Sequence, residues 1–243
     1  MKQGILLSLI SALLLIALPS AQAAPPTNNC FTCHGEVEDN TGPAHLFRDD
    51  IHFQKGLGCQ DCHGGDPTLE DMDAVRSSKG FRGVPDRADI PDFCARCHSD
   101  PAYMRDHNPS LPVDQLDKYK TSVHGLRLFQ HKDSKVATCV SCHTAHRIGD
   151  ARMPHSSTYP TNLLITCGAC HNDKALMAEY GIPTDQVEKY RNSVHGQALL
   201  VKEDLSAPVC NDCHGNHGAA PPDARSLSDV CGNCHAIEAS LYQ

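Results

Sequence analysis

The feature that most constrains this chain is a five-residue pattern that occurs seven times. Each copy has two cysteines separated by two residues, and a histidine follows the second cysteine at once. The cysteine pairs are Cys30/Cys33, Cys59/Cys62, Cys94/Cys97, Cys139/Cys142, Cys167/Cys170, Cys210/Cys213 and Cys231/Cys234, and the histidines are His34, His63, His98, His143, His171, His214 and His235. The seven copies use all 14 cysteines, so none is left for another purpose.

Cys-x-x-Cys-His is the attachment signature of c-type haem. Two thiols three positions apart lie on adjacent turns of a helix-like segment, where each can form a thioether with one haem vinyl group. The histidine that follows supplies the proximal iron ligand. A disulfide framework has no reason to place a histidine after each second cysteine, and a zinc ribbon would use the pairs two by two, which seven does not allow. The pattern therefore predicts seven covalently attached haem c groups.

The rest of the composition supports this interpretation. The chain has no Trp and only 6 Phe and 6 Tyr among 243 residues. A chain so poor in large apolar side chains cannot easily bury a conventional core. We expect the haem groups to fill the interior of a mainly α fold with much irregular loop and little or no β-sheet.

Two stretches of the chain repeat each other at a constant offset of 71 residues. Each contains Ser-Val-His-Gly, with His124 or His195 as its histidine, followed by a Cys-x-x-Cys-His motif. Each then has another histidine three residues after the motif, His146 or His217. The constant spacing suggests that a lone histidine, a haem motif and a second histidine form one structural unit.

A degenerate copy precedes these two. Asp50-Ile51-His52-Phe53 stands where Ser-Val-His-Gly is expected, and Asp66 stands where the second histidine is expected. The three repeats each read as histidine, haem, haem: His52 with Cys59 and Cys94, His124 with Cys139 and Cys167, and His195 with Cys210 and Cys231. We divide the chain into a leader (1–23), an N-terminal trihaem segment (24–110) and a C-terminal tetrahaem segment (111–243).

Apolar residues at helical spacing predict helices from Asp114 to His124 and from Asp185 to His195. A glycine follows each histidine, as is typical of a helix C-cap. The histidine would then lie in the last turn, near the negative end of the helix dipole. Asp100 before Pro101 predicts the start of another helix, and the stretch from Asp173 corresponds to it.

Nine histidines outside the motifs are enough to give each haem a second imidazole. The repeat favours His124 and His195 as distal ligands. His146 and His217 follow a proximal histidine so closely that each must reach a neighbouring haem. His52 is a candidate by position. The remaining histidines divide between ligand and surface positions, with His45 and His107 better candidates than His131 and His155, and Met104 and Met177 are expected to be packing residues.

The N-terminus predicts a secretory signal peptide that is cleaved after Ala23, because Lys2 precedes an apolar run and Ala21-Gln22-Ala23 fits a cleavage site. The run from Ile5 to Leu18 is shorter than the ~20 residues that a spanning helix needs. The whole chain has 21 Lys and Arg against 29 Asp and Glu, a net charge of −8. This charge disfavours nucleic acid and favours a redox partner with a basic docking patch.

The repeated Ser-Val-His-Gly, Cys-x-x-Cys-His-x-x-His and Cys-Gly-x-Cys-His resemble the multihaem c-type cytochromes of the cytochrome c3 and cytochrome c554-like groups. The resemblance covers nearly all of Cys30 to His235. It implies closely spaced, bis-His, low-potential haems in a periplasmic or secreted protein of anaerobic respiration. No histidine follows the last motif, so the ligation of the His235 haem is the least defined.

Three functions compete on this basis. An electron carrier would need no open iron position, and all seven motifs end in histidine with further histidines to spare. A multihaem oxidoreductase of the nitrite or hydroxylamine type would need one open haem site. A membrane-anchored quinol-oxidising cytochrome would need a retained N-terminal helix. We expect an electron carrier rather than an enzyme, whose partners include a membrane quinol-oxidising complex or a terminal reductase.

Overall fold

The computed structural model describes residues 28–37, 39–222 and 227–241. These residues form short helices joined by irregular loops, and none of them lies in a β-strand. The mainly α fold expected from the sequence is confirmed. The predicted signal peptide lies outside the described residues. Within the described part of the chain, no helix combines the length and the apolar character needed to cross a bilayer.

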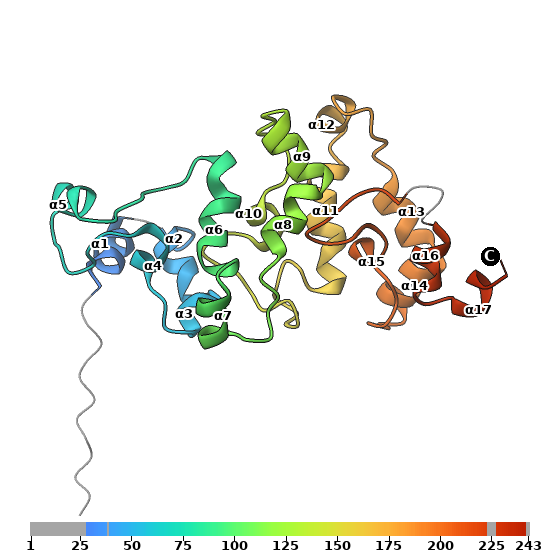
Figure 1. Ribbon diagram of the computed structural model, residues 1–243, viewed down its shortest axis with the longest axis horizontal. Coiled ribbons are helices and arrows are strands. Elements are labelled where there is room, and N and C mark those ends of the chain that lie inside the picture. The colour runs from blue at the N-terminus through green and yellow to red at the C-terminus, as the bar shows by residue number, and fades with distance from the viewer. Residues whose placement is uncertain (1–27, 38, 223–226, 242–243) are drawn as a thin grey trace, which may run out of the picture.

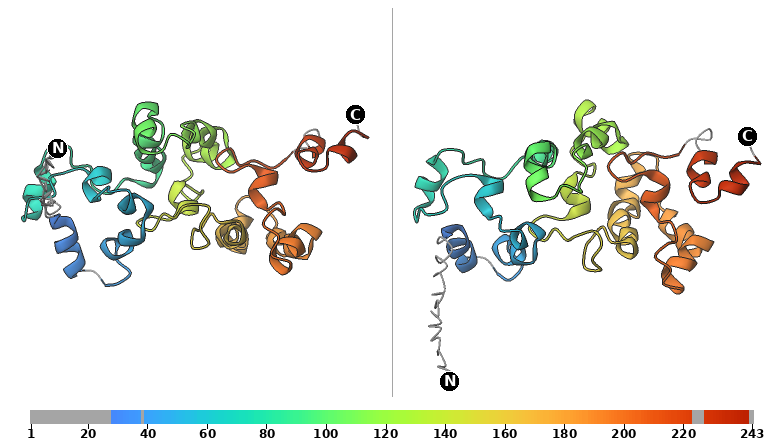
Figure 2. Two further views of the ribbon diagram at one scale, coloured as in Figure 1. Left: turned by 90° about the horizontal axis from the view of Figure 1, so that it is seen from below. Right: turned by 60° about the horizontal axis from the view of Figure 1, so that its bottom comes forward.

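The groups of helices follow one another along the long axis of an elongated molecule, in the order of the sequence (Figures 1 and 2). The first group is α1 (Asn29–Val37), α2 (Pro43–Leu46), the 3-10 turn η1 (Phe47–Asp49), α3 (Ile51–Gln54), α4 (Cys59–His63) and α5 (Met72–Ser77). The second, after η2 (Arg87–Asp89), is α6 (Ile90–His98), α7 (Pro101–His107), α8 (Gln115–Thr121), α9 (Val123–Gln130) and α10 (Cys139–His143). After η3 (Pro160–Asn162), the third is α11 (Leu163–His171), α12 (Lys174–Ala178), α13 (Gln186–Asn192), α14 (Val194–Val201) and α15 (Cys210–His214), and α16 (Leu227–Gly232) and α17 (Ala236–Ala239) follow.

We call the three groups the first, second and third units. The second and third units are two copies of one five-helix arrangement. Helix α6 contacts α8 and α10, and α11 contacts α13 and α15 in the same way. The hydroxyl of Tyr119 donates a hydrogen bond to the carbonyl of Ala137 (2.7 Å), and the hydroxyl of Tyr190 donates to the carbonyl of Pro208 (2.8 Å). Each pair of bonded residues recurs at the offset of the sequence repeat, so the sequence repeat is also a structural repeat.

Successive units are joined by a recurring backbone hydrogen bond. The N–H of Ile51, at the start of α3, donates to the carbonyl of Ile148 (2.8 Å). The N–H of Val123, at the start of α9, donates to the carbonyl of Ala219 (3.0 Å). Each acceptor lies in the loop after the haem motif of the following unit. That loop also carries the second histidine of the repeat, so this joint brings the histidine toward the preceding unit.

The prediction of one continuous helix up to Ser-Val-His-Gly is wrong. Helix α8 ends at Thr121, and Ser122 begins α9, with its Oγ accepting a hydrogen bond from the N–H of Gly125 (2.9 Å). Serine is a favoured N-cap residue because its oxygen satisfies a free N–H of the first turn. A Cβ at Gly125 would lie 1.9 Å from the carbonyl oxygen of Tyr119, so glycine is needed for this close approach and not as a C-cap. The third unit has the same arrangement, with Ser193 as the cap.

This correction changes the electrostatic setting of the histidine. His124 lies in the first turn of α9 and not in the last turn of α8. It is therefore near the positive end of a helix dipole, which disfavours a protonated imidazole. The other two predicted helix starts are confirmed: Asp100 accepts hydrogen bonds from the first turn of α7, and Asp173 does the same for α12.

Within the described residues, buried apolar side chains form two small clusters, one in each of the five-helix units. The buried members are Tyr119, Leu128 and Val136 in the first cluster, and Leu164, Val187, Leu199, Ala207 and Val209 in the second. Leu128 and Leu199 occupy equivalent positions and are almost fully buried. Met104 and Met177 are also buried, as expected for packing residues. Tyr119 is the one aromatic residue among these buried cluster members, which fits a chain that leaves most of its interior to another group.

Candidate haem-binding sites

Five of the seven haem motifs form or end short helices. Helices α4, α10 and α15 consist of the five motif residues alone, and α6 and α11 end on the motif histidine. Two of the shortest helices are stabilised from within the motif: Asp61 accepts a hydrogen bond from the N–H of Gly58, and Asp212 accepts one from Val209, both at 2.7 Å. An acidic residue in the first turn also complements the helix dipole. All 14 cysteines are free, so both sulfurs of each motif remain available for thioether bonds.

The chain leaves three of these helices by a left-handed residue directly after the motif histidine. This residue is Gly64 (φ 70°), Thr144 (φ 66°) or Gly215 (φ 75°). Thr144 combines its positive φ with ψ −178°, a region that is essentially restricted to glycine. His146 follows with φ 59°. Backbone strain of this kind concentrates at functional sites, and here it marks the loop that carries a predicted distal ligand.

Five pairs of histidine rings lie with their centroids about the same distance apart. Each pair combines one motif histidine with one histidine from outside the motifs. The pairs and their centroid distances are His98 with His52 (5.9 Å), His63 with His146 (5.9 Å), His171 with His124 (6.3 Å), His143 with His217 (6.0 Å) and His235 with His195 (6.1 Å). Residues far apart in the sequence are thus brought together at a similar centroid distance, although the angle between the two ring planes ranges from 15° to 80°.

The gap matches the space required by an iron ion with two axial imidazoles. A transition metal holds an imidazole nitrogen at about 2.0–2.1 Å, so two rings on opposite sides of it have centroids roughly 6.3 Å apart. The observed distances of 5.9–6.3 Å are close to this value. The residues present therefore fit bis-His haem iron at five of the seven motifs.

Burial lowers the pKa of five of the paired histidines and so favours the neutral form that a metal ligand must have: His98, His124, His143, His171 and His217. Burial, with the neighbouring His217 and His98, lowers the pKa of His143 to about 4. Burial also lowers the pKa of His124, and the neighbouring His171 acts in the same direction. The position of His124 in the first turn of α9 supports the same protonation state.

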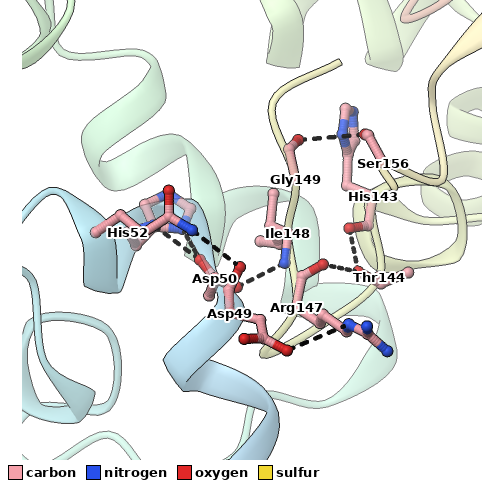
Figure 3. A network of polar contacts seen from close by, with 10 residues as sticks. Asp49, Asp50, His52, His143, Thr144, Arg147, Ile148, Gly149 and Ser156 are labelled. Carbon is pink, nitrogen blue, oxygen red and sulfur yellow. Dashed lines mark hydrogen bonds and ion pairs between the residues drawn. The ribbon is translucent and has the colours of Figure 1, made fainter. Parts of the chain in front are cut away.

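Nδ1 has a hydrogen-bond acceptor in three of the histidines that belong to the motifs or the ring pairs. The Nδ1 of His63 lies 2.8 Å from the carbonyl oxygen of Gly83, and the Nδ1 of His214 lies 3.2 Å from that of Ala220. Figure 3 shows the third case, in which the Nδ1 of His52 lies 2.8 Å from Oδ1 of Asp50. An acceptor at Nδ1 fixes the tautomer and orientation that leave Nε2 free for the metal.

Asp50 is part of the candidate site, and the sequence analysis does not identify it. Burial by itself would raise the pKa of this carboxyl, but hydrogen bonds from His52 and Ile148 hold it below its usual value. The signal in the sequence is the aspartate in place of the serine of Ser-Val-His-Gly. On the sequence alone, the aspartate appears only as a divergence of the first copy from the other two.

Cysteines of successive motifs adjoin one another along the whole described chain. Thiols from consecutive motifs lie close together in three cases: Cys30 with Cys59, Cys94 with Cys139 and Cys167 with Cys210. The intervening steps bring Cys62 near Cys97, Cys142 near Cys170 and Cys213 near Cys231. The motifs are thus arranged in space in the order of the sequence, each beside the next.

The two ends of this series differ from its middle. Cys33 in the first motif and Cys234 in the last are exposed, whereas both cysteines of each motif from the second to the fifth are partly buried. Cys33 adjoins Cys30 of its own motif, and Cys234 adjoins Cys213 of the motif before it. The sulfurs of Cys33 and Cys234 are therefore more accessible than those of the second to fifth motifs.

The other candidate histidines have different surroundings. His45 lies on α2, which contacts the first motif helix α1. The ring of His107 stacks on Tyr103 at 3.9 Å, and its Nδ1 bonds the carbonyl of the same residue. His131 and His155 are exposed. His214 shows no ring contact with another histidine among the described residues, whereas His235 has His195 beside it.

Comparisons with known proteins agree with this geometry. The model of the family described as cytochrome c3 matches residues 51–172, which is half of the chain. C-type polyheme cytochrome OmcC of Geobacter sulfurreducens is 23% identical over 231 residues, covering 81% of this chain and 27% of that protein. The chain thus spans about a quarter of the length of this relative. No solved structure shows a significant match.

The family match includes the four complete motifs between Cys59 and His171. It also includes both members of three ring pairs, among them His52 with His98. The motifs, the ring pairs and the match lead to one conclusion. The chain belongs to the cytochrome c3 family and is a multihaem c-type cytochrome with covalently bound haem and a role in electron transfer.

Proposed function

We propose that this chain is a periplasmic or secreted heptahaem cytochrome that carries electrons between redox proteins in anaerobic respiration. The observation that supports it best is the set of five ring pairs, each with the spacing of two axial imidazoles. An iron with two protein ligands has no open position for a substrate, so it is suited to electron transfer.

The ring pairs give a proposed ligand set. His52, His124, His146, His195 and His217 are the distal ligands of the haems whose proximal ligands are His98, His171, His63, His235 and His143. His45 is the candidate for the haem of His34, because α2 contacts α1. His52, His124 and His195 lie at the start of a helix, and each is assigned to the next haem motif that begins a new group of helices. His146 and His217 follow a motif, and each is assigned to a haem of the preceding unit.

This exchange of ligands holds neighbouring haem positions together. His217, three residues after His214, pairs with His143 of the preceding unit, so one short loop is fixed at two motifs. Haem iron, when bound, supplies one-electron redox chemistry. The contribution of the protein is to keep each motif beside the next, as the adjoining cysteines do. We therefore expect an unbroken path for electrons from haem to haem along the long axis of the molecule.

His214 supports a second candidate function, that of a multihaem oxidoreductase. Its side chain is exposed, and within the described residues no other histidine ring faces it. A haem at this motif with an open sixth position would bind a small ligand such as carbon monoxide in the reduced protein. One ligand-binding haem per chain, with a high-spin signal in the oxidised protein, would favour this alternative over a pure carrier.

The haem content tests the main proposal. The mature protein should contain seven haems by pyridine haemochrome assay, and its intact mass should show all seven covalently attached. A mass with only four or five haems would refute the interpretation of the degenerate N-terminal copy. Recovery in the soluble periplasmic fraction with Ala24 as first residue is also expected. Recovery in the membrane with the leader intact would favour the quinol-oxidising alternative.

A further inference from the structure

The buried carboxylate of Asp50 is the feature that the proposed function leaves unexplained. Its side chain is only 1% exposed. A buried carboxylate is costly unless hydrogen bonds satisfy it. Oδ1 accepts from the backbone N–H of His52 (2.9 Å) and from the His52 ring (2.8 Å), and Oδ2 accepts from the N–H of Ile148 (2.7 Å) (Figure 3). One side chain thus contacts both a proposed ligand and the loop that follows His146.

The equivalent residues of the other two units lack the contact with the ring. Ser122 bonds the N–H of Gly125 and the carbonyl of Tyr119, and Ser193 makes the same two kinds of bond. Both serines cap a helix and neither bonds a histidine ring. Asp50 also caps its helix, through the N–H of His52. The contact from carboxylate to imidazole is therefore an addition to the capping role.

The charge of Asp50 is directed at the imidazole. The ring of His52 is the one side chain that the Asp50 carboxylate bonds among the described residues. The nearest ion pair in the same network joins Arg147 to the exposed Asp49, at 3.9 Å, and does not include Asp50. No Lys or Arg in the described chain is therefore paired with Asp50 to offset its effect on the ring.

We propose that Asp50 is a positioning residue that orients the His52 ring and lowers the reduction potential of the haem attached at Cys94 and Cys97. This rests on the proposed pairing of His52 with His98. A carboxylate that accepts a hydrogen bond from Nδ1 makes the imidazole a stronger donor, and a stronger donor stabilises oxidised iron. Through Ile148, the same carboxylate holds the loop of His146, which faces His63.

Three substitutions in the full, haem-loaded protein test this proposal. Asp50→Asn keeps the size of the side chain and removes its charge, and Asp50→Ser introduces the residue found in the other units. Asp100→Asn is the matched control, because Asp100 caps α7 two residues after His98 and its side chain bonds only backbone N–H groups of that helix. His52→Met marks the haem in question, since methionine ligation raises the potential of a haem. Each midpoint potential is followed by redox titration with NMR detection of the haem methyl groups.

The proposal predicts that Asp50→Asn and Asp50→Ser raise the potential of the haem marked by His52→Met more than that of any other haem. The protein should remain low-spin with its full haem content, and Asp100→Asn should leave this potential near that of the wild type. If Asp50→Asn moves the marked haem no further than the control does, the role of Asp50 is refuted while the ligand assignment stands. If His52→Met moves no haem, the assignment fails and the proposal fails with it.

Discussion

At the scale of single residues, the surroundings of a histidine distinguish candidate ligands from surface residues. His124 and His131 lie on or beside the same helix α9, only seven positions apart in the sequence. The ring of His124 faces His171 at 6.3 Å, whereas His131 is exposed at the end of the helix. The two therefore form a natural test pair for the ligand assignment.

Replacing His124 with alanine should convert one haem from low-spin to high-spin, because its iron loses an axial imidazole. The change should appear in the electron paramagnetic resonance spectrum of the oxidised protein, and the haem content should stay at the wild-type value. His131→Ala should leave the spectrum unchanged. Identical, fully low-spin spectra for both variants would contradict the assignment of His124.

Prediction at this scale succeeds where chemistry requires a residue type. The Cys-x-x-Cys-His motifs can be found without a structure, because covalent attachment needs those side chains at that spacing. The histidine that pairs with each motif histidine cannot be found in this way, because the two members of a ring pair belong to different units. The ring of His63 lies beside that of His146, and the ring of His143 lies beside that of His217. The contact of Asp50 with the His52 ring depends on a side-chain orientation that the spacing of the residues does not fix.

At the scale of helices, the junction between α8 and α9 determines where the distal histidine lies. The sequence from Asp114 to His124 has continuous helical periodicity, so it predicts one helix. The serine cap and the contact between Gly125 and Tyr119 break that helix at Ser122. Apolar periodicity cannot reveal such a break, since Tyr119 before it and Leu128 after it belong to the same buried cluster. The sequence shows that Gly125 is the last residue of Ser-Val-His-Gly. Only the structure shows that it lies too close to the Tyr119 carbonyl for any residue other than glycine.

A methyl group at this junction should destabilise the unit. In Gly125→Ala the new Cβ would meet the Tyr119 carbonyl at 1.9 Å, so the backbone must shift. Overpacking of this kind costs about 1–3 kcal/mol, and denaturant unfolding should show a loss of that order. Because His124 is the preceding residue, the low-spin spectrum of one haem should also change.

Gly35→Ala is the control for this variant. Gly35 also lies in a helix, α1, but a Cβ there has no neighbour within 4 Å. Alanine in a helix interior is more stable than glycine by roughly 0.5–1 kcal/mol, so this variant should be slightly more stable than the wild type. Equal destabilisation by both substitutions would show that the close approach at Gly125 is not the cause.

At the scale of the whole molecule, an elongated shape and a net negative charge determine how partners approach. The motifs follow one another along the long axis (Figure 1). The chain carries a formal net charge of −8, and haem propionates add to it. A negative surface attracts cationic partners over distances set by the ionic strength. The mainly α class of the molecule follows from its composition, but its elongated form depends on the joints between units.

Electron exchange should therefore be faster with a cationic than with an anionic small redox complex of matched potential. The ratio of the two rates should fall as ionic strength rises from about 0.01 M to about 0.15 M, because the screening length shrinks from about 30 Å to about 8 Å. Stopped-flow measurement of both rates gives this ratio. A ratio that does not depend on salt would contradict the docking of a basic partner by long-range attraction.

The hydrogen bonds that join the units also bear on the order in which haem attachment and axial ligation can occur during synthesis. The loop fixed by Ile51 and Ile148 belongs to the unit that is synthesised later, and it carries the ring that faces His63. In a chain that emerges from its N-terminus, Cys59 and Cys62 are available for attachment well before His146 exists. Attachment and axial closure are then separate events in time. Each newly made unit supplies the second ring for one motif of its predecessor, so the axial closure of that motif follows its synthesis by one unit.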